Sequence, residues 1–169
     1  SNQALTLRVD QALTNLKGLI AAATLDVKAT SLDNSGGTLT SRANLDLSLD
    51  GLLNNQNEGL INATNGLTIN SRGLNNQSGS LLGSAIAIDF GAATADLNNS
   101  GGLITTVGVL SIQHLRDLSN RNGEISSTQS LDLSARALDN TGAKLISNNV
   151  LTVNARSEER RVGKECMES

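Results

Sequence analysis

The sequence LDNSGG, residues 32–37, returns almost unchanged as LNNSGG at residues 97–102. Two further variants, LNNQSG and LDNTGA, begin at Leu74 and Leu138. All four share a leucine that is followed two positions later by an asparagine. A motif that recurs in this way at widely separated points indicates that the chain is built from internal repeats.

The Leu-x-Asn motif sets the length of the repeat, because seven of its copies follow one another at spacings of 19, 21, 21, 23, 21 and 20 residues. The leucines that open it are Leu13, Leu32, Leu53, Leu74, Leu97, Leu118 and Leu138. The asparagines are Asn15, Asn34, Asn55, Asn76, Asn99, Asn120 and Asn140. A glycine follows each leucine by four to six positions and favours a turn. An aliphatic residue stands seven positions after each leucine, in the order Ile20, Leu39, Leu60, Leu81, Ile104, Ile125 and Leu145.

The residues before most of the motifs alternate between apolar and polar side chains. Leu131 and Leu133, for example, alternate with Asp132 and Ser134, which places the leucines on one face of a strand. The repeat unit is therefore interpreted as strand, turn and strand. A period near twenty residues is shorter than a propeller blade or a helical repeat. The sequence predicts an all-β fold, a β-solenoid of roughly seven to eight coils stacked about 4.8 Å apart.

The repeated asparagine predicts a ladder along the solenoid. Asn34 is expected at a corner in a tight or left-handed backbone conformation, which asparagine tolerates better than most residues. Because its amide can both donate and accept, stacking on Asn15 and Asn55 would join neighbouring coils by hydrogen bonds. A catalytic residue is needed once and not in every coil, so the seven asparagines are interpreted as structural and no catalytic residue is predicted.

The composition argues against several classes of protein. A net charge of -3 and a pI near 5.1 provide no basic face for nucleic acid. Cys166 and His114 are the only residues of their types, which leaves too few ligands for a zinc cage. No apolar run is long enough to span a membrane. We therefore predict no nucleic-acid partner, no membrane insertion and no metal or cofactor site, and we expect any secretion signal to lie outside this sequence.

The motif LDNSGGTL at residues 32–39 and its copies, each preceded by a strand such as LDL or LTI, resemble the repeats of filamentous haemagglutinins. Related two-partner-secretion exoproteins, including contact-dependent growth-inhibition toxins, share these repeats. The resemblance covers residues 4 to about 156. It implies a right-handed parallel β-helix, export through an outer-membrane partner transporter of a Gram-negative bacterium, and service as an adhesin shaft. The Asn-Pro motifs of the family's secretion domain have no counterpart, since the chain contains no proline.

The pattern departs from regularity in two places. The spacing of 23 residues falls around GSAIAIDFGAATAD, residues 83–96, where we predict a small outward bulge. Phe90, the only aromatic residue, either fills a void there or anchors a receptor, and the first interpretation is favoured. The other departure is the tail at residues 157–169, in which 7 of 13 residues are charged. We expect the repeat domain to end at residue 156. The tail resembles translated sequencing-adapter read-through and is expected to be non-native and disordered, with a charged cap as the alternative.

Two classes of function compete. The favoured one is a structural shaft of a secreted or cell-surface bacterial adhesin or inhibition toxin, which presents distal domains and has host glycans or neighbouring bacterial cells as candidate partners. The alternative is a carbohydrate-active β-helix enzyme, a polysaccharide lyase or glycosidase. Asp26 and Asp46 share an outward position in neighbouring coils, about 5 Å apart, near the separation of a retaining glycosidase pair. No aromatic platform or arginine cluster accompanies them, and His114 has no nucleophile beside it, so a solvated surface is favoured.

Three Asn-x-Ser/Thr triplets begin at Asn62, Asn76 and Asn98. Such a triplet can accept a sugar on the asparagine amide, but in an asparagine-rich repeat it also arises by composition.

Overall fold

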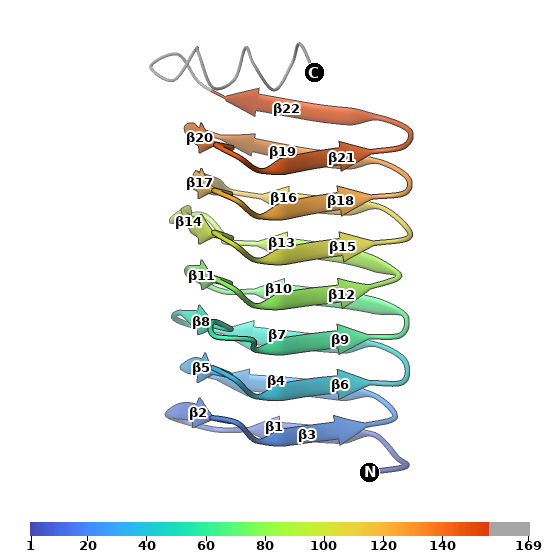
Figure 1. The fold of residues 1–169 in the computed structure, drawn as a ribbon. Helices are drawn as coiled ribbons and strands as arrows, with labels where there is room; N and C mark the ends of the chain where they lie inside the picture. The colour runs from blue at the N-terminus through green and yellow to red at the C-terminus, as the bar shows by residue number, and fades with distance from the viewer. Residues whose placement is uncertain (156–169) are drawn as a thin grey trace.

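Residues 1–155, which a computed structural model describes, wind into an all-β solenoid (Figure 1). With the N-terminus below, the front strands run from left to right and the rear strands return from right to left as the chain rises. This winding is right-handed. None of the described residues forms a helix with the length and apolar character needed to cross a bilayer. The predicted tail, residues 157–169, lies outside the described residues, so its character stays a prediction.

Each coil contributes one strand to each of three parallel sheets, which we name A, B and C. Sheet A contains β1 (Leu5–Arg8), β4 (Leu25–Ala29), β7 (Leu45–Leu49), β10 (Gly66–Asn70), β13 (Ala85–Asp89), β16 (Leu110–Gln113), β19 (Leu131–Ala135) and β22 (Leu151–Ala155). Sheet B contains β2 (Ala12–Thr14), β5 (Ser31–Asp33), β8 (Leu53–Asn54), β11 (Leu74–Asn75), β14 (Ala95–Asn98), β17 (Leu115–Ser119) and β20 (Ala137–Asp139). Sheet C contains β3 (Leu19–Ala22), β6 (Thr38–Ser41), β9 (Leu60–Ala63), β12 (Ser80–Gly83), β15 (Leu103–Thr106), β18 (Glu124–Ser127) and β21 (Lys144–Ser147).

The coils are numbered from the N-terminus, so that coil 1 is β1 to β3 and coil 7 is β19 to β21, while β22 begins an eighth. The predicted unit of strand, turn and strand was therefore one strand short. The leucine that opens each motif lies in a separate sheet B strand of two to five residues. Strands this short show no extended alternation, and the sequence pattern did not reveal them.

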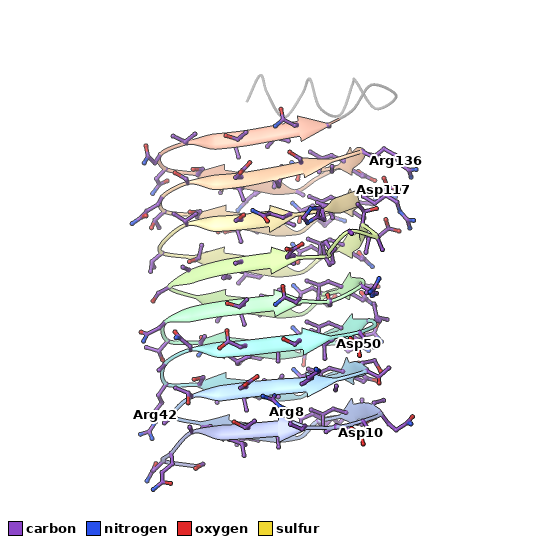
Figure 2. The ribbon with its side chains drawn as sticks, turned by 180° about the vertical axis from the view of Figure 1, so that it is seen from behind. Arg8, Asp10, Arg42, Asp50, Asp117 and Arg136 are labelled. Atoms are coloured by element: carbon purple, nitrogen blue, oxygen red, sulfur yellow. The ribbon has the colours of Figure 1, made fainter. Side chains whose placement is uncertain are left out.

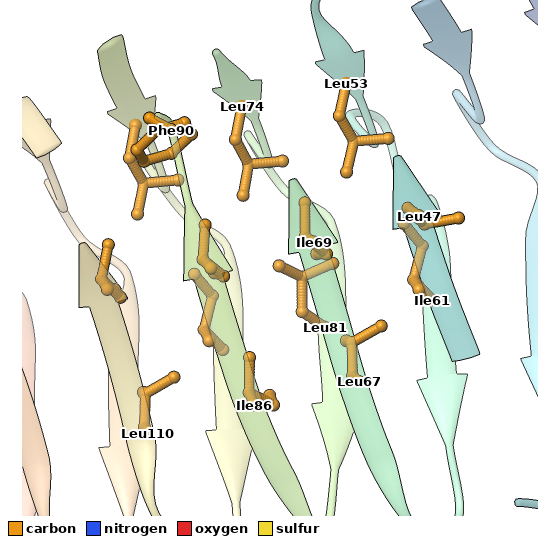
Figure 3. Packing of buried hydrophobic residues seen from close by; sticks show 14 of the residues in the cluster. Leu47, Leu53, Ile61, Leu67, Ile69, Leu74, Leu81, Ile86, Phe90 and Leu110 are labelled. Atoms are coloured by element: carbon orange, nitrogen blue, oxygen red, sulfur yellow. The ribbon is translucent and has the colours of Figure 1, made fainter. Parts of the chain in front are cut away.

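The core is a stack of aliphatic columns in register. Leu67 pairs with Leu45 on one side and with Ile86 on the other, while Leu74 pairs with Leu53 and Leu97. Figure 3 shows Leu67, Leu74 and Ile86 among the side chains inside the coils. Nearly all inward leucines and isoleucines of coils 2 to 7 are fully buried. Burial of each such side chain stabilises the fold by roughly 1.5–3 kcal/mol, and only stacked coils provide it.

The inward residue that follows the turn is displaced by one position in coil 3. In coil 3 it is Ile61 that is buried and pairs with Leu39, whereas Leu60 lies on the outer face. The turn between Asn55 and Gly59 holds one residue more than the other turns, so the strand begins one position later. The residue seven positions after the motif leucine therefore points outward in coil 3. The structure keeps the register of the strands, while the length of the turn varies.

The wide spacing in coil 5 produces the predicted bulge. Residues 90–94 connect β13 to β14, and Ala92, Ala93 and Thr94 are exposed. The pairing of β14 with β17 shifts register between Ala95 and Leu97. Phe90 is only 2% exposed and belongs to the hydrophobic core (Figure 3). The interpretation of Phe90 as a residue that fills a void is confirmed.

Candidate functional site: the asparagine column

The seven motif asparagines lie in one column at the turn between sheets B and C. Each of the first six donates its side-chain Nδ2–H to the Oδ1 of the asparagine in the next coil, at 2.7 or 2.8 Å. The column thus runs without a break from Asn15 to Asn140, and every amide points the same way along the axis.

Each interior amide also ties its own turn to the next coil. Asn76 Nδ2 lies 3.3 Å from the carbonyl oxygen of Gly79 in its own turn and 3.3 Å from that of Leu103 in the following coil. Its Oδ1 accepts from Asn55 at 2.8 Å. Asn76 is fully buried, so these contacts satisfy an amide that has no access to water. The geometry is suited to holding coils in register, and it offers no free group for chemistry.

The left-handed residue of the turn is not the one expected. Asn34 was predicted in that conformation, but the positive φ belongs to the residue two positions later, Gly36 at 63°. The corresponding residues of other coils include Lys17, Ser78 and Asn122, at 52°, 56° and 55°. Asn34 cannot both leave the extended region and keep its side chain in the column. The residue with positive φ is therefore the one two positions after the asparagine, where the side chain projects outward.

A glycine closes each turn in coils 1 to 6 because the coils approach most closely there. A Cβ atom added to Gly79 would lie 1.9 Å from the carbonyl oxygen of Asn55 and 2.7 Å from Oδ1 of Asn76. At Gly102 and Gly123 the carbonyl of the preceding coil would be 2.3 and 2.2 Å away. Close backbone approach, and not a positive φ, therefore requires glycine at this position.

A second, outer column lies one residue before the asparagines and caps the turns. Oδ1 of Asp33 accepts the backbone N–H of Ser35 at 3.0 Å, and Oδ1 of Asp139 accepts that of Thr141 at the same distance. Asn75 and Asn98 make the equivalent bonds. Hydrogen bonds from Thr141 hold the pKa of Asp139 below its usual value. Aspartate and asparagine both occur in this column because both offer the required acceptor.

Charged residues form pairs between successive coils on the outside of sheet B. Arg116 donates to Asp96 through Nε and Nη2 at 2.8 and 2.7 Å, and Arg136 donates to Asp117 at 2.9 and 2.5 Å. Figure 2 shows Asp117 and Arg136 projecting from the same edge of the solenoid. The hydrogen bond from Arg116, together with its charge, lowers the pKa of Asp96, although partial burial opposes this shift. The sequence analysis missed these pairs, because each joins residues 19 or 20 positions apart.

The Asp96 pair has a measurable pH signature. Because its pKa is lower in the folded chain than the unfolded value of about 3.9, the pair stabilises the fold above that pH. This contribution is lost as the pH falls through the folded value. We expect Arg116→Gln to raise the pKa of Asp96 toward 3.9, as followed by carboxyl carbon shifts in an NMR titration. Arg121→Gln, which removes the partner of Asp139 instead, should leave Asp96 unchanged. An unchanged pKa in Arg116→Gln would disprove the pairing.

The candidate acids of the enzyme alternative are in register, but one of them, Asp26, is already paired with an arginine. Asp26 pairs directly with Asp46 between β4 and β7. Asp26 accepts hydrogen bonds from Arg8 at 3.1 and 3.3 Å, and its side chain is 47% exposed. Among residues 1–155 no three His, Cys, Asp or Glu side chains gather as a metal site would require. The arrangement of Asp26 and Asp46 matches a solvated surface.

His114 has a partner that sequence reasoning did not find. Its Nδ1 lies 2.7 Å from Oδ1 of Asp89, and the side chains are 51% and 40% exposed. The pKa of Asp89 is lowered by the backbone N–H of Gly91 and by His114. His114 adopts a positive φ of 56° at the corner between sheets A and B. Among the described residues the side-chain hydrogen bond of His114 goes to this aspartate and to no nucleophile, so the two residues form a hydrogen-bonded pair on the surface.

Comparison with known proteins was made at three levels. The model of one family, described as haemagglutinin repeat, matches residues 1–57, 44–114 and 92–157 in overlapping segments. A search of curated proteins found no match, and neither did a search of solved structures.

Proposed function

Because the chain belongs to the haemagglutinin repeat family, a structural repeat of adhesins, we propose that residues 1–155 are a segment of the rigid shaft of a large bacterial adhesin or contact-dependent inhibition toxin. Haemagglutinin repeats occur in secreted or surface-exposed adhesins. In the proposed role, the shaft holds a distal binding or effector domain away from the cell.

The observation that carries this proposal is the unbroken stacking of the coils. The aliphatic core and the asparagine column both continue from coil 1 to coil 7. Each strand pairs only with strands of the coil below and the coil above. Such a stack resists bending, because any bend must open backbone and side-chain hydrogen bonds at the same layer. Mechanical reach is the property that this architecture supplies.

The remaining partners follow from the family resemblance. We propose that the parent protein is exported by two-partner secretion through an outer-membrane transporter of a Gram-negative bacterium. Once it is outside, host glycans or neighbouring bacterial cells are its targets. The net charge of -3 supports a partner other than nucleic acid.

Extra coils provide the test. Inserting four copies of residues 55–75 after residue 75 restores Leu-Asn-Asn at every junction. We expect this chain to fold and its rod to lengthen by about 19 Å, as measured by small-angle X-ray scattering. Cells that display the parent adhesin with the same insertion should bind their target as strongly as before, since the shaft only sets distance.

A register control accompanies the insertion. Copies of residues 55–75 that lack Thr68, inside β10, are one residue shorter and turn the following inward side chain of that strand outward, so they should disrupt the stack. Target binding that rises in proportion to the number of copies of residues 55–75 would contradict the proposal. The inserted coil itself would then be the binding site.

A further inference from the structure

The three Asn-x-Ser/Thr triplets lie in different structural environments. Asn76 is fully buried in the asparagine column, where its Nδ2 is committed to Asn99 and to two carbonyl groups. Asn98 is half-buried in the outer column. Its Oδ1 accepts the N–H of Ser100 at 3.0 Å, and its Nδ2 lies 3.3 Å from Asn75 Oδ1. A sugar on Nδ2 would break the column at Asn76 and disturb the turn cap at Asn98.

Asn62 is free of such constraints. It lies on the outer face of β9 and is partly exposed, and its side chain forms no hydrogen bond with any residue that the structure describes. Thr64, the third residue of its triplet, follows the end of β9 and is exposed at the corner between sheets C and A. The acceptor amide is accessible to an enzyme, and so is Thr64, whose hydroxyl donates one hydrogen bond of 3.3 Å to the carbonyl oxygen of Ser41.

A notch beside Asn62 provides space for an attached group. Only Ser84 separates β12 from β13 in coil 4, whereas two residues fill the same corner in coil 3 and three in coil 5. The shorter corner leaves a hollow, lined by Asn62, Thr64, Leu82, Ser84, Thr105 and Val107. Leu82 is partly exposed and Val107 is 63% exposed. A sugar ring on Asn62 would cover apolar surface here and could donate to or accept from the threonine hydroxyls.

The surroundings are also uncharged. The strands of sheet C in coils 1 to 5 contain no Asp, Glu, Lys or Arg. Sheet A carries charged residues such as Arg8, Lys28 and Asp46 over the same coils. A neutral hexose could therefore approach Asn62 without displacing an ion pair.

We propose that Asn62 is an N-glycosylation site and that its first sugar, a neutral hexose, occupies the notch at coil 4. The co-reactant is a sugar activated as a nucleoside diphosphate or lipid diphosphate ester. Nδ2 of Asn62 attacks the anomeric carbon, the new N–C bond forms as the C–O bond to the diphosphate breaks, and the diphosphate leaves with the electron pair. The transferase takes one proton from Nδ2. This modification site is independent of the proposed shaft function.

The test uses the folded chain, UDP-glucose and a soluble transferase that recognises Asn-x-Ser/Thr. The transferase is chosen because it modifies synthetic peptides of residues 58–68, 72–82 and 94–104 equally. Peptide mapping by mass spectrometry should find a hexose on Asn62 of the folded chain. We expect none on Asn76 and at least tenfold less on Asn98, since the fold protects both. A folded chain left unmodified at Asn62, or modified equally at Asn98, would overturn the proposal.

Two variants and one stability measurement sharpen the result. Thr64→Ala destroys the triplet and should abolish modification, whereas Thr68→Ala, outside any triplet, should leave modification unchanged. The melting temperature of the glucosylated chain should equal or exceed that of the unmodified chain, because the sugar fits the notch. A clear decrease would show that the notch does not accommodate the sugar and would refute that part of the proposal.

Discussion

Replacing Asn76 with aspartate is expected to reduce the free energy of unfolding by about 3–5 kcal/mol at neutral pH. The substitution preserves shape but removes both N–H donors and introduces a negative charge. One carboxylate oxygen would still accept from Asn55. The other would face three acceptors: Oδ1 of Asn99 at 2.7 Å, and the carbonyl oxygens of Gly79 and Leu103 at 3.3 Å. Because residue 76 is fully buried, no water can relieve this repulsion.

The destabilisation should depend on pH with a defined sign. Burial against three acceptors, with a single donor from Asn55, raises the pKa of the carboxyl group above the unfolded value of about 3.9. The folded Asn76→Asp chain therefore binds its proton more tightly than the unfolded chain does. Relative to wild type, the variant should lose stability as the pH rises from 3.9 toward the folded pKa, and the loss should be constant above that value. Urea unfolding followed by far-UV circular dichroism at several pH values measures both effects.

Asn75→Asp is the matched control for this prediction. It makes the same chemical change one residue earlier, in the partly exposed outer column. Natural aspartates, Asp33 and Asp139, already occupy the corresponding positions of coils 2 and 7 and cap their turns. We expect a change below about 1 kcal/mol, from the lost 3.1 Å hydrogen bond to Gln56. Equal effects of the two substitutions would show that the asparagine column does not contribute to stability.

Gly79→Ala is expected to destabilise the solenoid by about 3 kcal/mol, the upper part of the range for overpacking. The added methyl group would lie 1.9 Å from the carbonyl oxygen of Asn55, which is backbone and cannot rotate away. Relief would require neighbouring coils to separate at the turn, which would lengthen the hydrogen bond from Asn55 to Asn76. Thermal and urea unfolding of the variant measure the loss.

Gly66→Ala provides the comparison, because the nearest atom to its new methyl group, Oδ1 of Asn44, would be 3.5 Å away. Its φ is not positive, so alanine should be neutral or stabilise by up to about 1 kcal/mol through the unfolded chain. In coil 7 an alanine, Ala143, stands at the position that Gly79 occupies in coil 4. The hydrogen bond from its N–H to the carbonyl oxygen of Asn140 is 3.2 Å, against 3.0 Å for the bond from Gly79 to Asn76. Among the described residues no turn stacks beyond coil 7, so that turn can move along the axis. Tolerance of Gly79→Ala in an interior coil would contradict the close approach.

Much of the fold was predictable because a solenoid repeats one environment. The Leu-x-Asn spacing and the alternation of Leu131 and Leu133 were sufficient to predict stacked parallel strands. The errors came from features that lie within one coil or between two. The extra residue before Gly59 places Ile61 inward in place of Leu60. Counting by a fixed repeat length does not reveal an insertion within one turn. The left-handed position at Gly36 depends on turn geometry that composition does not specify.

The candidate site was less predictable than the fold. The sequence pointed to the row of asparagines, because one residue type recurred at one position. It did not identify the ion pair of Asp96 and Arg116, whose partners share no motif and meet only through stacking. The triplets alone also did not rank the three sugar sites, because neither the burial of Asn76 nor the partial exposure of Asn62 follows from an Asn-x-Ser/Thr pattern. Identifying candidate sites other than the asparagine column therefore required the burial and the hydrogen bonds of individual side chains.

The longer turn of coil 3 has a consequence for how such a gene changes over generations. One additional residue between Asn55 and Gly59 leaves the asparagine contacts on either side at 2.8 Å. Small insertions at this corner are thus nearly silent, whereas a single codon gained inside a strand would turn its side chains over. Unequal recombination between the similar DNA segments that encode LDNSGG and LNNSGG would add or remove whole coils in frame. We expect allelic variants to differ in coil number and turn length while every strand keeps its register.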